Sequence, residues 1–217
     1  MSCWMFLLVE KMAGSDPNDD FEAREITRIR QDIIASSLDG DYLPAVEHLK
    51  HSAPKVRATV LKVLDNEGKL EKEMIETALM DSAFDVRYAL AYLISSNLEI
   101  PAMNFLRDDD PSIVEVACWG VGERGDASAE ILETLQSITE SHEDALCRES
   151  AVAALGALGD EKALGSILKA VDDIATVRRR AVLALSPFDG PEVDSAIVKA
   201  LEDRDWQVRQ AAEDISR

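Results

Sequence analysis

One short motif returns six times along the chain and constrains the fold more than any other feature of the sequence. Each copy starts at a buried-type anchor residue that is followed in most copies by arginine: Val56-Arg57, Val86-Arg87, Ile113-Val114, Cys147-Arg148, Val177-Arg178 and Val208-Arg209. The spacings between anchors are 30, 27, 34, 30 and 31 residues. A small or aliphatic residue stands four residues after each anchor, and an aliphatic residue stands eight after the first five. A repeat of this length predicts a stack of supersecondary units rather than a globule around one centre.

Each period divides into two segments of helix length. Clear first helices are expected at 69–80, 127–139, 161–171 and 191–202. The second helices begin just before each anchor and are expected at 54–65, 84–96, 111–123, 144–158, 175–186 and 205–216. Residues 21–38 place isoleucines on one helical face, which predicts an additional helix covering the N-terminal end of the stack. No segment alternates with period two, so no sheet is predicted.

The composition narrows the classes of partner and compartment. The formal net charge of −19 argues against nucleic acid, because a surface that binds phosphates needs clustered Lys and Arg. The charge is typical of a solvated acidic surface, and it also fits a preference for cationic partners. Three cysteines without a CxxC pair indicate a reducing, cytoplasmic setting. No apolar run approaches the ~20 residues of a membrane span, so no membrane partner is expected.

The N-terminal residues are expected to lie outside the folded domain. Residues 1–20 are predicted to be a disordered or mis-started tail, in which the residues before Met12 are either an upstream start-codon artefact or a frayed end. Residues 21–217 are predicted to form a single solenoid domain, most simply a monomer.

Three aspartates stand six residues before a motif arginine: Asp81 before Arg87, Asp172 before Arg178 and Asp203 before Arg209. With the small-residue second helix, as in 151–160, this pattern resembles the HEAT repeat, and more narrowly the short HEAT-like repeats first noted in phycobilisome lyases. The resemblance covers about residues 41–216. It implies an all-α, right-handed and armadillo-like α-solenoid of about six helix pairs with an N-terminal capping helix.

The resemblance also implies a structural ladder in which these aspartates and arginines tie neighbouring turns together. The ladder is expected to be broken in three places. His51 and His142 stand where an aspartate would precede Arg57 and Arg148, and Val114 stands where an arginine would follow Asp108. The junction of repeat 3 is therefore predicted to be the least rigid.

No constellation of residues predicts catalysis, a cofactor or a metal. A diiron site, known in one HEAT-repeat hydroxylase, needs several converging His and carboxylate ligands, and the chain has three histidines. The dyad His142-Glu143 falls in a turn and has no partner dyad. Cys118 and Cys147 are expected to be buried apolar residues rather than nucleophiles. The protein is accordingly expected not to be an enzyme.

The remaining candidate site is the wall formed by the second helices. Positions 2 and 6 after each anchor lie opposite the buried face at 100° per residue and are expected to line the concave side. The candidate partner-binding residues on this wall are Tyr88, Tyr92, Glu115, Trp119, Glu149 and Arg179. Exposed Tyr and Trp are enriched in interface hot spots. An equally weighted alternative is that these aromatic side chains pack against a neighbouring loop or first helix. Arg178, Arg179 and Arg180 are interpreted as a ladder residue plus solvated charge, or as a cationic end of the groove.

Two functions remain. The first is a non-catalytic scaffold or adaptor that binds a peptide or a helix of another protein in its concave face. The alternative, implied by the lyase resemblance, is a lyase-type or chaperone-like subunit that assists attachment of a tetrapyrrole to another protein.

Overall fold

The computed structural model describes residues 17–125 and 127–216, which contain helices and turns and no strand. The chain divides into two compact units, unit 1 (Met1–Lys69) and unit 2 (Leu70–Arg217), and each is described by itself. The predicted all-α solenoid is confirmed. The prediction of a single domain over 21–217 stays a prediction.

The described part of unit 1, residues 17–69, contains three helices: α2 (Pro17–Leu38), α3 (Leu43–Glu47) and α4 (Pro54–Asn66). Helix α2 packs against α4, and Arg30 Nε donates to Thr59 Oγ1 at 2.8 Å. Burial and the neighbouring Arg30 lower the pKa of Lys62 on the same face of α4. Lys62 is half-buried, because α2 and α4 share this face.

The N-terminal prediction lies largely outside the described residues. Helix α2 begins at Pro17, four residues before the expected helix start, so residues 17–20 are helical rather than part of a tail. The predicted disorder and mis-assigned start concern residues that the structure does not describe.

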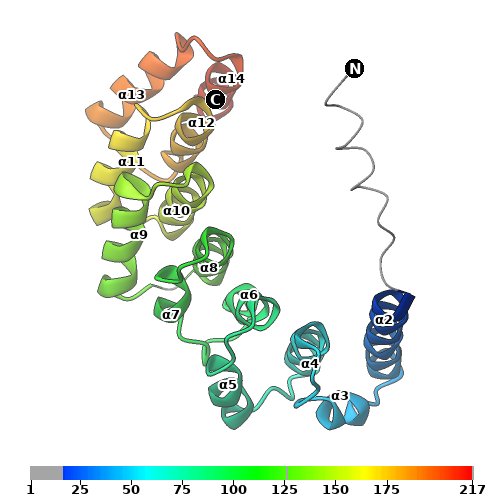
Figure 1. The fold of residues 1–217 in the computed structure, drawn as a ribbon. Coiled ribbons are helices and arrows are strands. Elements are labelled where there is room, and N and C mark those ends of the chain that lie inside the picture. Colours follow the sequence, from blue (N-terminus) through cyan, green and yellow to red (C-terminus); the bar gives the residue numbers. More distant parts are fainter. Residues whose placement is uncertain (1–16, 126, 217) are drawn as a thin grey trace, which may run out of the picture. The chain divides into compact units, whose positions relative to one another are not determined.

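Unit 2 is built of two layers of helices. The first helices are α5 (Lys72–Leu79), α7 (Met103–Leu106), α9 (Ala129–Ser141), α11 (Leu164–Ala170, preceded by the 3-10 turn Glu161–Ala163) and α13 (Pro191–Leu201). The second helices are α6 (Phe84–Leu93), α8 (Pro111–Arg124), α10 (Ala145–Leu158), α12 (Ala175–Ala184) and α14 (Trp206–Ile215). Within this unit the second helices lie side by side on the inner side of the curve, and the first helices lie on the outer side (Figure 1).

The repeat motif forms the core. Every anchor from Val56 to Val208 is at most 1% exposed, and the residues four positions after all six anchors and eight positions after the first five are fully buried. Because these three positions share one helical face, each second helix turns the same stripe toward its repeat. This periodic burial explains why the motif recurs with the repeat.

Glycines inside two second helices allow neighbouring second helices to pack closely. A Cβ atom added at Gly156 of α10 would lie 2.6 Å from both Cα and Cβ of Ala184 on α12. A Cβ at Gly120 of α8 would lie 3.0 Å from Ile94 Cβ and 3.1 Å from the Ala91 carbonyl oxygen. These glycines therefore set the spacing of the inner layer.

Candidate functional site

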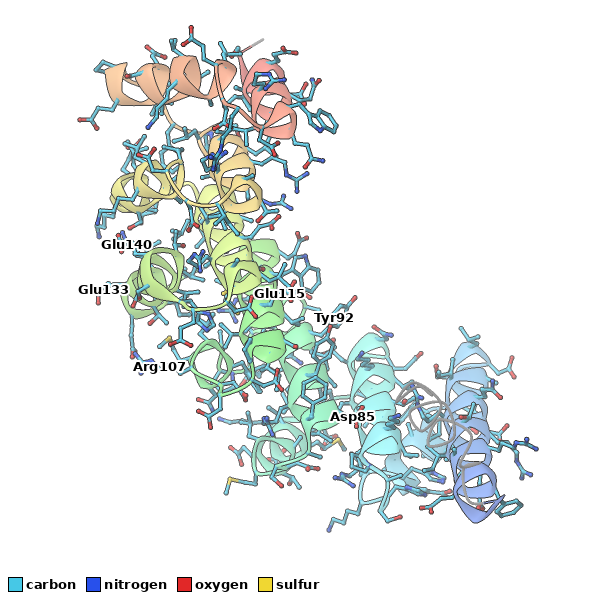
Figure 2. The ribbon with its side chains drawn as sticks, turned by 45° about the horizontal axis from the view of Figure 1, so that its top comes forward. Asp85, Tyr92, Arg107, Glu115, Glu133 and Glu140 are labelled. Atoms are coloured by element: carbon cyan, nitrogen blue, oxygen red, sulfur yellow. The ribbon has the colours of Figure 1, made fainter. Side chains whose placement is uncertain are left out.

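The second helices of unit 2 expose the residues at positions 2 and 6 after each anchor, which we call the second-helix face. Its members are Tyr88, Tyr92, Glu115, Trp119, Glu149, Ala153, Arg179, Leu183, Gln210 and Asp214. All of them are half-buried or exposed, whereas the anchors of the same helices are buried. Tyr92 and Glu115 lie on one side of the unit, away from Arg107, Glu133 and Glu140 of the first-helix layer (Figure 2).

Two pairs of aromatic rings lie on helices α6 and α8. The rings of Tyr92 and Trp119 are stacked, with centroids 5.1 Å apart and an interplanar angle of 25°. Tyr92 is 45% exposed and Trp119 is 37% exposed. Phe84 and Tyr88 form a second, tilted pair with centroids 5.6 Å apart. The stacked pair places a rigid apolar surface on the second-helix face.

A groove of about 600 Å³ runs beside Trp119 between α8 and α10. Its floor is made of small residues, because Gly122, Ala153, Ala154 and Ala157 line it. A Cβ atom at Gly122 would lie 3.0 Å from the Ala154 Cα atom, so the two helices nearly touch beneath the groove. Trp119 and Leu146, which is 56% exposed, supply large apolar side chains to its lining.

The charged residues of the groove differ in their ion pairing. Glu149 Oε1 lies 3.4 Å from Arg179 Nη2 and 3.6 Å from Arg180 Nη2, so two cations surround one carboxylate. Glu115 and Glu123 also line the groove, and neither carboxylate has an ion pair with a described residue. The groove therefore contains two uncompensated negative charges on α8.

The motif arginines form ion pairs between successive repeats of unit 2, which we call the Arg–Asp ladder. Three of these arginines donate through Nε and Nη2 to a carboxylate in the turn before the next second helix. The pairs are Arg87–Asp108 at 2.9 and 3.4 Å, Arg148–Asp173 at 2.7 and 2.8 Å, and Arg178–Asp203 at 2.9 and 2.8 Å. The remaining Nη1 atom donates to backbone carbonyls of the arginine's own turn, as in Arg178 to Asp173 at 2.8 Å. Each arginine thus fixes its own turn and the next repeat together.

These bonds shift the pKa values of the ladder carboxylates. The hydrogen bonds from Arg178 hold the pKa of Asp203 below its usual value, and those from Arg148 do the same for Asp173. Burial acts in the opposite direction and is outweighed. Both carboxylates are consequently ionised near neutral pH.

The structure places the predicted ladder residues in different roles. Asp172 is exposed and pairs with Lys199 instead of a motif arginine. Asp173 takes this role and lies four residues before its anchor, whereas Asp203 lies five before Val208. Asp173 Oδ1 accepts from the backbone N–H of the next residue, Ile174. Asp81 Oδ1 accepts a hydrogen bond from the backbone N–H of Ala83.

The last motif arginine bonds only the backbone of its own turn. Arg209 Nη1 donates to the carbonyls of Asp203 and Arg204 at 2.7 and 3.2 Å. No carboxylate of the described residues pairs with it.

Two of the expected ladder breaks, at Val114 and His142, belong to the same junction, where one Arg–Asp pair is missing. Asp108, expected to be unmatched beside Val114, is bound by Arg87 of the preceding repeat. At the next junction Val114 replaces the arginine and His142 replaces the carboxylate. Other bonds join these repeats: Cys147 Sγ donates to the Pro111 carbonyl at 3.2 Å, and Ser150 Oγ donates to the Glu115 carbonyl at 2.9 Å. That this junction is the least rigid stays a prediction.

The two histidines reproduce the turn but not the ion pair. His51 Nδ1 accepts from the backbone N–H of Ala53 at 3.0 Å, and His142 Nδ1 accepts from that of Asp144 at 3.1 Å. Asp203 makes the same bond to Asp205 at 2.8 Å. A histidine at this position therefore still closes the turn before its second helix.

The first-helix layer carries its own ion pairs, which the sequence reading missed. Those between successive repeats are Arg107–Glu130 at 3.3 Å, Lys169–Glu140 at 2.8 Å and Lys199–Asp172. The residues of the three pairs are 23, 29 and 27 positions apart, so no local sequence pattern predicts these ion pairs. They are largely exposed, and each contributes little to stability.

The candidate nucleophiles are inaccessible. Cys118 and Cys147 are free and buried. Burial raises the pKa of the Cys118 thiol and raises that of Cys147 to about 11.

No cluster of three or more potential metal-ligating side chains occurs within 17–125 and 127–216. Over these same ranges, none of the helices combines the length and apolar character that crossing a bilayer requires.

The fold and the ladder define an α-solenoid repeat protein. Residues 101–186, from α7 to α12, match the model of HEAT repeats, which supports the HEAT-repeat family for this segment. No curated protein matches the sequence significantly. The narrower resemblance to the repeats of phycobilisome lyases is not confirmed.

Solved structures show the same kind of fold. YibA of Escherichia coli aligns with a TM-score of 0.62 and 15% identity, over 92% of this chain and 74% of that one. The designed armadillo repeat protein YIII(Dq)4CqI aligns with a TM-score of 0.54 and 15% identity, over 79% of this chain and 96% of that one. Armadillo and HEAT-like folds of this kind are typical of protein-interaction scaffolds.

Proposed function

We propose that the protein is a non-catalytic scaffold that binds a segment of another protein, a peptide or a helix, on the second-helix face of unit 2. The observation that carries this proposal is the exposed Tyr92–Trp119 stack at the edge of the groove between α8 and α10. Large aromatic side chains beside a groove are the residues from which interface hot spots are most often built. Tyr88, Glu115, Glu149 and Arg179 extend the candidate interface along the same face.

The physical basis is the cost of leaving aromatic surface in water. Burying apolar surface contributes about 25 cal/mol per Å², and an indole ring is the largest such surface that a side chain can offer. The Tyr92–Trp119 stack orders both rings before a partner arrives, so little rotamer entropy is lost on binding. A partner that covers this stack gains affinity without a rearrangement of the helices.

A catalytic role receives no support from the candidate residues. The two described cysteines are buried and protonated at neutral pH. A cytoplasmic location fits these free thiols. The alternative of a subunit for tetrapyrrole attachment is not favoured either, because the lining of the groove contains neither His nor Cys. A bilin or haem titration that shows saturable binding would revive that alternative.

Site-specific photo-crosslinking in cells tests the proposal. A photoreactive residue at Leu146, which is exposed beside the groove, should capture a discrete partner. The same residue at Glu133 on the first-helix layer is the matched control. Capture from position 146 that disappears in Trp119→Ala supports the proposal. Equal capture from positions 146 and 133 contradicts the proposal, and so does capture from position 146 that is unchanged in Trp119→Ala.

A further inference from the structure

The stripe along α8 in the groove combines one aromatic ring with two free carboxylates. Glu115, Trp119 and Glu123 are four residues apart, so they follow one another on the same helical face. The side chains of such neighbours start about 5–6 Å apart, which brings both carboxylates within reach of a group seated on the indole. Of the charged residues in this groove, these two glutamates are the ones without a cation.

The indole presents one open face to the groove. Tyr92 covers the other face through the stacked contact at 5.1 Å, while Trp119 remains 37% exposed and lines the groove. The face of an indole attracts cations because its ring quadrupole is negative there. A negative ring face between two carboxylates favours a positively charged group more strongly than either feature alone.

The cations already present do not occupy this position. Arg179 and Arg180 both lie on α12 and are directed to Glu149. Glu149 is thereby neutralised, and the negative charge of the groove is left at Glu115 and Glu123. The same contacts place the positive charges on the α12 side of the groove. The groove is therefore cationic near α12 and anionic along α8.

We propose that the groove binds an arginine side chain of the partner, with its guanidinium on the open face of Trp119 between the carboxylates of Glu115 and Glu123. This inference rests on the proposed function and specifies the chemistry of the partner segment. Arginine fits better than lysine because its planar guanidinium is less strongly hydrated and stacks on an aromatic ring while it donates to carboxylates at its edge. Leu146, which also lines the groove, offers an apolar surface for the methylene stem of the same side chain.

The experiment uses the ¹⁵N-labelled full chain and short peptides that differ at one central residue. That residue is arginine, lysine, glutamate or citrulline, the neutral analogue of arginine. The indole N–H signal of Trp119, assigned by its loss in Trp119→Phe, reports occupation of the groove. The arginine peptide should shift this signal saturably, the lysine peptide more weakly, and the citrulline and glutamate peptides not at all.

A matched pair of double variants separates the groove from the overall negative charge of the chain. Glu115→Gln with Glu123→Gln should weaken the arginine peptide by about tenfold or more, because both side chains lose the charge that strengthens a hydrogen bond from a guanidinium. Glu76→Gln with Glu133→Gln removes the same charge from exposed positions on α5 and α9 and should leave the affinity nearly unchanged. Equal losses in the two variants would overturn the proposal, because they would show attraction by net charge alone.

The remaining outcomes distinguish this inference from the proposed function. If the citrulline peptide shifts the Trp119 signal as strongly as the arginine peptide, the arginine assignment fails and the binding face survives. If no peptide shifts the signal while crosslinking from Leu146 captures a partner, the arginine assignment again fails alone. Failure of that crosslinking overturns the proposed function and this inference together.

Discussion

Arg178 and Asp203 are joined by two parallel hydrogen bonds, of 2.9 and 2.8 Å, across the junction of the last two repeats. The Arg178 side chain is 8% exposed and that of Asp203 is 16% exposed. Arg178 is the one charged residue that is buried within the described ranges. The pair therefore couples two repeats through charges that are largely shielded from water.

Replacing Arg178 should destabilise the protein more than replacing any neighbouring arginine. Arg178→Ala leaves Asp203 without its cation in a mostly buried position, and breaking such a pair costs about 3–5 kcal/mol. Arg179→Ala removes a half-exposed arginine 3.4 Å from Glu149 and should cost less than about 1 kcal/mol. Urea unfolding followed by circular dichroism measures both free energies, and equal losses would show that the ladder does not hold the repeats together.

Arg87→Ala should fall between these two variants. Its side chain is 30% exposed, against 8% for Arg178, although its partner Asp108 is 9% exposed. Water can reach the guanidinium of Arg87, so its loss is partly compensated by solvent. The same unfolding measurement should rank the losses as Arg178, Arg87, Arg179, and a loss for Arg87 above that for Arg178 would contradict the dependence on burial.

The contribution of Asp203 should depend on pH. Its pKa is lower in the folded protein than in the unfolded chain, so its stabilisation is present above the unfolded value of about 3.9. It is lost as the pH falls through the folded pKa. Wild type should therefore be more stable than Asp203→Asn at about pH 7, and the difference should shrink toward about pH 2. A difference that stays constant over this range would show that the carboxylate charge is not what stabilises the junction.

Two glycine variants test the close packing of the inner layer. Gly156→Ala places a Cβ atom 2.6 Å from the backbone of Ala184, so α10 and α12 must move apart at a cost of about 1–3 kcal/mol. Gly165→Ala lies on the exposed side of α11 with nothing within 4 Å and should stabilise by up to about 1 kcal/mol. Thermal melting should shift in opposite directions, and a neutral Gly156→Ala would indicate a looser inner layer.

Metal removal should leave the fold unchanged. The repeats are held by apolar packing and the Arg–Asp ladder, and the described residues contain no cluster of metal-ligating side chains. Adding a chelator should not change the melting temperature or the helical circular dichroism signal. A clear decrease in melting temperature would show that a metal contributes to stability after all.

The repeat architecture could be predicted because it depends on local periodicity. The anchors, the residues four positions after them and those eight positions after the first five are all buried. This pattern can be recognised in the sequence because residues on one helical face are close in sequence. The bounds of the second helices follow from it to within a few residues, as for α4 and α8. The short helices α3 and α7 were not delimited, since one turn of helix carries little periodic signal.

Contacts between repeats could be predicted less well, because they depend on the turns. Asp173 rather than Asp172 binds Arg148, although Asp172 is the residue that stands six before the next motif arginine. Gly120, Gly122 and Gly156 could not be identified as packing residues, because the sequence around a helical glycine does not show which helix packs against it. The free carboxylates of Glu115 and Glu123 were not distinguishable from the paired Glu149, since pairing across 30 residues has no local pattern.

The paired determination of melting temperature and affinity for Trp119→Ala tests the central claim most directly. The ligand is the segment captured by crosslinking from Leu146, and Tyr92→Ala serves as the second variant on the same stack. Truncating a central interface aromatic costs about 2 kcal/mol, so Kd should rise about thirtyfold, while the melting temperature should fall by no more than about 3 °C. Unfolding of either variant with unchanged Kd in its folded fraction would instead show that these rings belong to the core and that the second-helix face is not the binding surface.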